Sequence, residues 1–122
     1  MQDELTTEYP SLPITLLSIN MIGSSSGVAS FSSDMDLPMV QDTDSDLIWD
    51  AWGGEWRDIR ILDGENKTYA TVNLTTYSLG NSGNYDSLKA LLVGAAEGTL
   101  CADVVHTLDA DGDGSPDTGI CQ

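Results

Sequence analysis

An α/β fold is predicted by three patterns that follow one another along the chain. Residues 14–21 form a continuous apolar run typical of a buried strand, residues 56–73 contain two strand-like segments around a turn, and residues 85–93 place apolar side chains at helical spacing. Hydrophobic residues make up 40% of the 122 positions, which is enough for one buried core. These patterns predict helices that pack on a sheet.

The first half of the chain is predicted to hold one strand and one short helix. Because residues 14–21 are apolar without alternation, we expect this strand to be buried on both faces. The Gly/Ser-rich residues 23–33 are expected to form a loop. Residues 44–52 then predict a short helix that stops at Gly53 and Gly54.

The second half is predicted to hold a hairpin and a further helix. Residues 56–62 alternate in polarity, residues 63–66 form a turn, and residues 67–73 supply the partner strand. Residues 85–93 predict a helix that ends at Gly94 and packs on the sheet.

The chain is expected to divide at the end of this helix, into an α/β domain at residues 1–94 and an acidic tail at residues 95–122 that leaves the core. The tail contains the two cysteines, Cys101 and Cys121, which flank its acidic residues. Joining them would close a loop of about twenty residues and stabilise the fold by roughly 3 kcal/mol. We favour this disulfide, which implies an oxidising compartment, over the alternative of two free thiols.

Between the cysteines, the tail has the residue order of a short calcium loop. Calcium takes roughly six to eight oxygen ligands, so a short loop must point several carboxylates inward. Gly114 stands where such a loop requires a positive φ, but Ile120 replaces the glutamate that an EF-hand has at its twelfth position. The loop therefore resembles those of dockerin and thrombospondin type 3 repeats. The predicted ligands are Asp109, Asp111, Asp113, the main-chain carbonyl of Ser115, and Asp117. A disordered acidic tail is the alternative that this composition also allows.

The charge of the chain excludes some partners and favours a location. Twenty acidic residues against four basic ones give a net charge of −16, which repels nucleic acid and anionic lipid. The apolar run at residues 14–22 is too short to span a bilayer, so we expect no membrane insertion. An acidic surface and a disulfide fit an extracellular, cell-surface or periplasmic location. No secretory leader is visible in the first ten residues, so the chain is expected to be a processed form or part of a longer reading frame.

The order of strand, long connection, helix, hairpin and final helix resembles the later part of the thioredoxin superfamily, in particular its secreted, redoxin-type members. The segments that carry the resemblance are Pro13 to Asn20, Leu37 to Asp42, Trp49 to Gly53, Trp56 to Asp63, and Tyr69 to Leu74. The resemblance spans roughly residues 11–93 and implies a thioredoxin-like three-layer sandwich. The first strand and the active-site helix are expected to be missing, because only about ten residues precede the first apolar strand.

The departures from that family predict a protein without its chemistry. Redoxins need a Cys-x-x-Cys at a helix start, where the helix lowers a thiol pKa, and this sequence has no such motif. At the position near Arg57 it also lacks the family's cis-proline. We therefore expect a non-catalytic, exported binding or structural module that calcium stabilises. The alternative is the C-terminal part of a thiol-disulfide oxidoreductase whose reactive cysteines lie upstream.

For three further features of the sequence we prefer a structural role to a functional one. His106 is expected to be a surface or loop side chain, because one histidine and two thiols lack zinc-site spacing. A second acidic cluster is expected to be a solvated face; its members are Asp34, Asp36, Asp42, Asp44, Asp46 and Asp50. Trp49, Trp52 and Trp56 are expected to pack in the core or hairpin, with glycan binding by these rings as a third candidate function.

Two sequons for N-glycosylation, Asn66-Lys67-Thr68 and Asn73-Leu74-Thr75, complete the set of motifs. They carry meaning only in a host that glycosylates exported proteins, which the sequence does not reveal.

Overall fold

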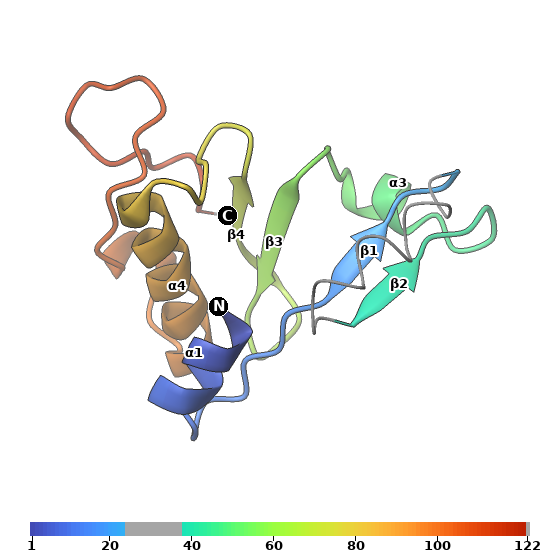
Figure 1. The fold of residues 1–122 in the computed structure, drawn as a ribbon, viewed down its shortest axis with the longest axis horizontal. Coiled ribbons are helices and arrows are strands. Elements are labelled where there is room, and N and C mark those ends of the chain that lie inside the picture. The colour runs from blue at the N-terminus through green and yellow to red at the C-terminus, as the bar shows by residue number, and fades with distance from the viewer. Residues whose placement is uncertain (24–37, 122) are drawn as a thin grey trace. The chain divides into compact units, whose positions relative to one another are not determined.

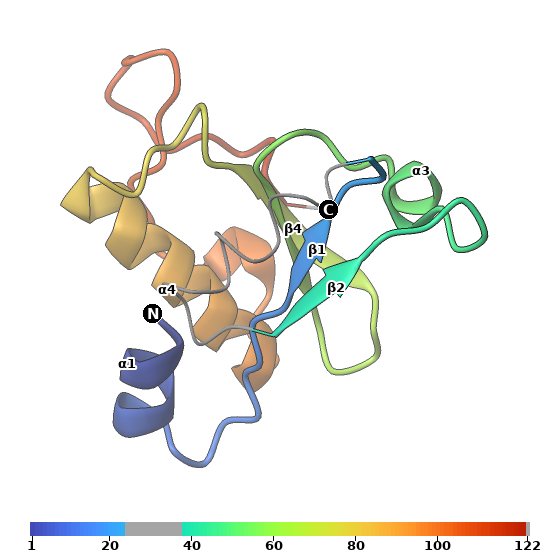
Figure 2. The ribbon, with the colours of Figure 1, turned by 45° about the vertical axis from the view of Figure 1, so that its right-hand side comes forward.

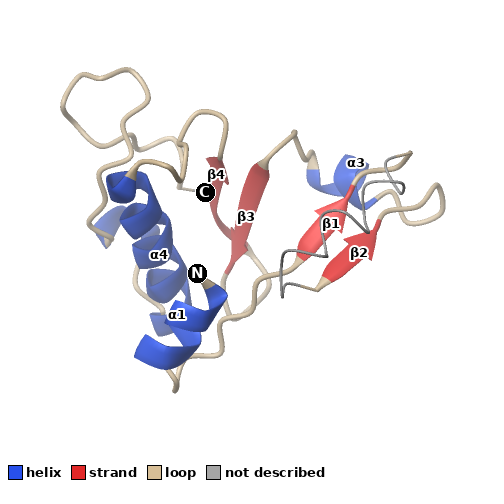
Figure 3. Cartoon of the chain, viewed as in Figure 1, coloured by secondary structure: helices blue, strands red, loops and turns tan. Residues whose placement is uncertain are grey.

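The computed structural model describes residues 1–23 and 38–121, which form a mixed α/β arrangement with small sheets (Figures 1 and 3). The predicted α/β class is therefore confirmed. The elements are α1 (Gln2–Glu8), β1 (Ser18–Asn20), β2 (Met39–Gln41), α3 (Ile48–Trp52), β3 (Asp58–Leu62), β4 (Thr68–Asn73), α4 (Ser82–Glu97) and the 3₁₀ turn η2 (Cys101–Asp103). The predictions for residues 24–37, including most of the Gly/Ser-rich loop, lie outside the described residues.

These elements form two compact units that do not follow the predicted boundary at residues 94 and 95. One unit holds Asp3–Ile14 with Met1 and all residues from Trp56 onward, and the other holds Thr15–Glu55 with Gln2. Each unit has its own two-stranded sheet, β3-β4 in the first and β1-β2 in the second. A thioredoxin-like sandwich around one central sheet is not confirmed by these elements.

The hairpin of the first unit matches the sequence prediction closely. Strands β3 and β4 pair antiparallel, with Asp58 opposite Asn73 and a register irregularity between Ile61 and Leu62. Val72 and Ile61 alternate with more exposed neighbours and are almost fully buried. Helix α4 contacts both strands, so one face of the hairpin is covered, as predicted.

Helix α4 continues past Gly94, so the predicted end at that glycine is wrong. The helix begins at an N-cap, Asn81, whose side chain accepts a hydrogen bond from the Asn84 N–H at 3.1 Å, and ends at Gly98 with φ of 78°. Gly94 lies inside the helix, where neighbouring side chains leave no room for a larger residue. A Cβ at this position would be 2.7 Å from Val104 Cγ2 and 2.9 Å from Tyr69 Oη. The glycine permits close packing instead of terminating the helix.

The tail returns to the core, which overturns the expectation that it leaves it. Leu108 and Ile120 are buried, and the Ile120 carbonyl accepts a hydrogen bond from the Thr71 N–H at 2.9 Å. Cys121 forms an isolated antiparallel bridge with Ala70. The apolar side chains of this unit form one core, whose most buried members are Leu5, Ile61, Ala70, Val72, Leu88, Leu91, Leu108 and Ile120.

Helix α1 has no counterpart in the sequence prediction. Its Leu5 is 1% exposed, and its Glu4 accepts a hydrogen bond from the Tyr85 hydroxyl at 2.9 Å. Lys89 of α4 makes ion pairs with Glu4 at 3.2 Å and Glu8 at 2.6 Å. Helix α1 therefore lies beside α4 (Figures 1 and 2) and is held by one buried leucine and by contacts to residues distant in sequence.

The second unit is built from shorter elements than the sequence predicts. Strands β1 and β2 are three residues each and pair parallel, with Ser18 opposite Met39. Leu17 is 54% exposed and Met21 is 37% exposed, so the expectation of a strand buried on both faces is wrong. Helix α3 begins at Ile48, later than the predicted residue 44, although Gly53 ends it in the left-handed region as expected.

Candidate metal centre

The acidic loop, defined here as residues 109–117, is closed at its base by the core. It starts directly after the buried Leu108, and the Leu108 carbonyl accepts a hydrogen bond from the Asp117 N–H at 2.7 Å. Ile120, three residues beyond the loop, is buried as well. The loop projects between these two anchors (Figure 1, red segment).

The carboxylates of the loop shape its backbone. Asp109 accepts hydrogen bonds from the N–H groups of Gly112 at 2.8 Å and Gly114 at 2.9 Å, one on each carboxylate oxygen. Both glycines have positive φ, 72° and 85°, which confirms the role that the sequence assigned to Gly114. Asp111 accepts in the same way from the Asp113 N–H at 3.1 Å. These bonds curl the chain into successive tight turns between Asp109 and Ser115.

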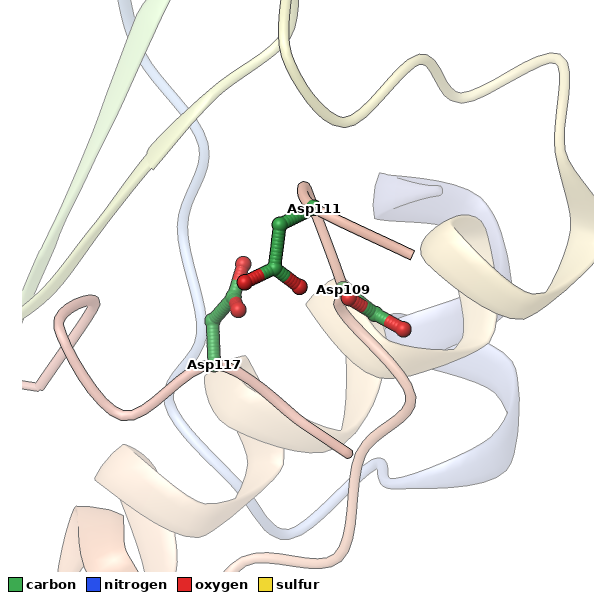
Figure 4. A group of neighbouring side chains, drawn as sticks. All are labelled: Asp109, Asp111 and Asp117. Carbon is green, nitrogen blue, oxygen red and sulfur yellow. The ribbon is translucent and has the colours of Figure 1, made fainter. Parts of the chain in front are cut away.

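Three of the predicted ligands are brought together by this curl. Asp109, Asp111 and Asp117 each offer a carboxylate oxygen, and these oxygens all lie within 4.8 Å of one another. Figure 4 shows the Asp111 and Asp117 carboxylates directed toward each other, with Asp109 beside them. A group of this kind can hold a metal ion.

The other two predicted ligands lie outside this group of three. Asp113 is exposed, and its carboxylate accepts a hydrogen bond from the Ser115 N–H at 2.8 Å. Ser115 is exposed as well. In the described structure these two residues shape the second turn of the loop, and their role as ligands stays a prediction.

Tyr77 anchors the loop and was not recognised in the sequence. Its hydroxyl donates a hydrogen bond of 2.5 Å to Asp117 Oδ2, which also accepts from the Ala110 N–H at 2.8 Å. Burial, the hydrogen bond to Asp117 and the nearby negative charges raise the pKa of Tyr77 to about 12, so the hydroxyl stays a donor at neutral pH. The two residues are forty positions apart, and no local pattern links them.

The electrostatics of the loop are those of clustered like charges. Hydrogen bonds from the Gly114 N–H, and then from other groups including the Gly112 N–H, outweigh burial and hold the pKa of Asp109 below its ordinary value. The two lysines are engaged with glutamates elsewhere, Lys89 with Glu4 and Glu8 and Lys67 with Glu65. Clustered carboxylates repel one another, and a bound cation would relieve that repulsion.

The predicted pairing of the cysteines is present. The sulfur atoms of Cys101 and Cys121 are 2.01 Å apart and the Cα atoms are 5.7 Å apart. Cys101 lies in η2, just after α4, and Cys121 lies beside strand β4. The bond thus ties both flanks of the acidic loop to the core.

His106 is a loop residue, as expected, with a structural hydrogen bond. Its Nδ1 accepts from the Leu108 N–H at 3.3 Å, and burial lowers the pKa of the imidazole although Asp117 opposes that effect. The neutral ring therefore helps to place the start of the acidic loop.

The tryptophans differ from one another in exposure. Trp49 is half-buried and its indole N–H donates to the Ile19 carbonyl at 3.2 Å, which agrees with a packing role. Trp56 is 66% exposed and Trp52 is 43% exposed, so the expectation of core or hairpin packing is wrong for both residues.

Asp42 is a structural anchor, in contrast to the solvated role expected for its cluster. The side chain is 2% exposed, and its carboxylate accepts from the N–H groups of Thr43 at 2.9 Å, Ile48 at 2.9 Å and Trp49 at 3.0 Å. These bonds satisfy the first donors of α3 and explain why the helix starts at Ile48. Asp34 and Asp36 lie outside the described residues, whereas Asp44 and Asp50 are exposed.

Asp42→Asn is expected to lower the melting temperature by about 5–10 °C at neutral pH, because an amide nitrogen would face a backbone donor. Burial alone would raise the pKa of Asp42, but the N–H donors of Trp49, Ile48 and Thr43 outweigh burial and lower the pKa from its ordinary value. A lowered pKa contributes stability above the unfolded pKa, and the contribution is lost as pH falls through the folded pKa.

The difference between wild type and Asp42→Asn should therefore shrink as the pH falls below the ordinary pKa of an aspartate, in thermal scans followed by circular dichroism. Asp44→Asn is the matched control, because Asp44 is exposed, and it should melt like wild type at neutral pH. A difference for Asp42→Asn that persists unchanged into strong acid would contradict this assignment.

No protein-family model, curated protein or solved structure matches this chain. Within the part of the chain that the structure describes, none of the helices combines the length and the apolar character needed to cross a bilayer.

Proposed function

We propose that this chain is an exported, non-catalytic α/β module whose acidic loop binds one calcium ion, and that the ion stabilises the fold. The observation that carries the proposal is the convergence of Asp109, Asp111 and Asp117 on a loop whose two ends are fixed in the core. The exported location is supported by the disulfide.

Calcium is favoured over other metals by the donor set. The group offers carboxylate oxygens, which suit hard cations, and the two cysteines are unavailable as thiolates because they form a disulfide. Asp113 and the main-chain carbonyl of Ser115 would add oxygens toward the roughly six to eight that calcium takes. A short loop with irregularly placed carboxylates suits calcium, which tolerates varied geometry, better than magnesium, which requires octahedral geometry.

The ion would act on stability because it joins mutually repelling groups. Its charge would neutralise part of the cluster, and its ligands span the loop from Asp109 to Asp117, next to the Leu108 anchor. Metal occupancy and local folding are then linked, since the unfolded chain holds no preformed site. Extracellular calcium modules bind with dissociation constants of about 0.1–1 mM, and we expect this range.

Calorimetric titration of the full chain tests the proposal. Wild type should bind one calcium ion, and Asp111→Asn should weaken binding at least about tenfold, because it removes one charged ligand of the group. Asp111 is chosen over Asp117 because the Asp117 carboxylate also accepts hydrogen bonds from the Tyr77 hydroxyl and the Ala110 N–H, so its replacement would disturb the loop as well as the metal site. Asp86→Asn makes the same charge change at an exposed position of α4, outside the acidic loop, and serves as the matched control. Equal affinities for wild type and Asp111→Asn would overturn the site.

The relation to thioredoxin-like proteins is part of the same proposal. It is supported by the hairpin β3-β4 followed by α4, which covers one face of it. The redoxin alternative requires reactive cysteines outside this chain, because both of its cysteines form the disulfide. No observation on the described residues favours that alternative over a binding or structural role.

A further inference from the structure

The two sequons occupy opposite structural situations, although both lie on the β3-β4 hairpin. Asn66 is in the turn between the strands, and Asn73 is the last residue of β4. N-glycosylation replaces one hydrogen of the side-chain nitrogen Nδ2 with a bulky sugar. The surroundings of each Nδ2 therefore decide whether the folded chain can accept it.

The Asn66 side chain is free to carry a sugar. It is exposed, and among the described residues no hydrogen bond holds its amide. The turn does not depend on that amide, because Asp63 Oδ1 accepts from the N–H groups of Glu65 at 2.8 Å and Lys67 at 3.0 Å. Asn66 has φ of 62°, which asparagine tolerates. Its neighbours Glu65 and Lys67 have side chains that are 74% exposed.

The Asn73 side chain is fully engaged. Its Nδ2 donates to the Trp56 carbonyl at 3.0 Å and to Asp58 Oδ1 at 2.8 Å, so both hydrogens are used. Its Oδ1 accepts from the N–H groups of Thr75 at 2.9 Å and Thr76 at 3.4 Å. A sugar on Nδ2 would break either the hydrogen bond to Asp58 in β3 or the one to the Trp56 carbonyl just before β3. The acceptor of the broken bond would be left without its donor.

We propose that Asn66 is an N-glycosylation acceptor of the folded chain and that Asn73 is not. In the transfer, Asn66 Nδ2 forms a bond to C1 of the first sugar of a lipid pyrophosphate-linked oligosaccharide. The bond from C1 to the pyrophosphate oxygen breaks, the lipid pyrophosphate leaves, and Nδ2 loses one proton. The Thr68 hydroxyl completes the recognition sequence.

A glycan at Asn66 would leave the acidic loop accessible. The turn that holds Asn66 is at one end of the hairpin, and the acidic loop lies toward the other end (Figures 1 and 2). The modification rests on the exported location in the proposed function but does not use the metal site.

The experiment incubates the purified, folded, disulfide-bonded chain with an oligosaccharyltransferase and a lipid-linked oligosaccharide, and measures site occupancy by peptide mass spectrometry. Two equal-length peptides, one for each sequon, provide the unfolded reference. We expect folded-chain occupancy at Asn66 to exceed that at Asn73 by at least about tenfold, after each is divided by the occupancy of its peptide. Thr68→Val should abolish modification at Asn66, and Thr75→Val should leave it unchanged.

Comparable normalised occupancy at the two sites, or an unmodified Asn66 in the folded chain, would overturn the proposal. The calorimetric titration is read separately on unmodified protein. A chain that accepts sugar at Asn66 and binds no calcium would overturn the metal site alone.

Discussion

Replacement of both cysteines by alanine is expected to lower the melting temperature of the chain by about 10–15 °C. The Cys101–Cys121 bond spans a sequence separation of 20, for which the chain-entropy estimate is roughly 3 kcal/mol. The bond also holds Cys121 beside Ala70, where the neighbouring Ile120 carbonyl pairs with Thr71. Loss of the bond therefore raises the conformational entropy of the denatured chain. It also removes a covalent restraint that holds the end of the tail against β4 in the folded chain.

The measurement is a thermal scan by circular dichroism in the presence of a chelator, so that metal binding does not contribute. The double variant avoids the unpaired thiol that either single variant would leave. Reduction of the wild type should reproduce the shift, because it breaks the same bond. A double variant that melts within about 2 °C of wild type would show that the bond adds no stability.

Calcium is expected to produce the second large effect, a rise in melting temperature of about 10 °C when its concentration is a hundredfold above the dissociation constant. The rise follows from binding to the folded chain alone, because the unfolded chain does not hold the three carboxylates together. Asp111→Asn should lose most of the rise, and Asp86→Asn should keep it.

Screening is the effect to separate from binding in this experiment. A chain with a net charge of −16 gains stability from any added salt, because cations reduce its self-repulsion. The reference sample therefore contains sodium chloride at matched ionic strength, and magnesium provides a second comparison. A rise of equal size in sodium chloride would contradict site-specific stabilisation by calcium.

The parts of the fold that sequence predicts are those with local causes. The hairpin follows from alternation around a turn, and the body of α4 follows from apolar residues at helical spacing. The curl of the acidic loop also has a local cause, since Asp109 bonds to Gly112 and Gly114 within a few residues. The sequence placed these elements correctly because their geometry needs no distant partner.

The parts that sequence missed depend on distant contacts. In the sequence, Gly94 predicts the end of a helix. In the structure it lies inside α4, where the absence of a side chain lets Val104 and Tyr69 approach the helix backbone closely. Helix α1 is held by Leu5 and by pairs with Lys89 of α4, more than eighty residues away. No pattern along the chain reports such contacts before the fold is known.

The same limit applies to single polar residues. Asp42 belongs to a run of acidic positions that resembles a solvated surface, yet its carboxylate is buried and caps α3. Tyr77 gives no signal of its bond to Asp117. Burial and hydrogen bonding, which composition does not encode, separate these residues from their neighbours.

Amide NMR spectra of the full chain, recorded with calcium and with a chelator at equal ionic strength, test the central claim most directly. If one ion joins Asp109, Asp111 and Asp117, the amide signals of residues 109–117 should shift on calcium addition, and those of the hairpin turn at Asn66 should stay in place. Superimposable spectra across residues 109–117 would contradict the claim that the acidic loop is a calcium site.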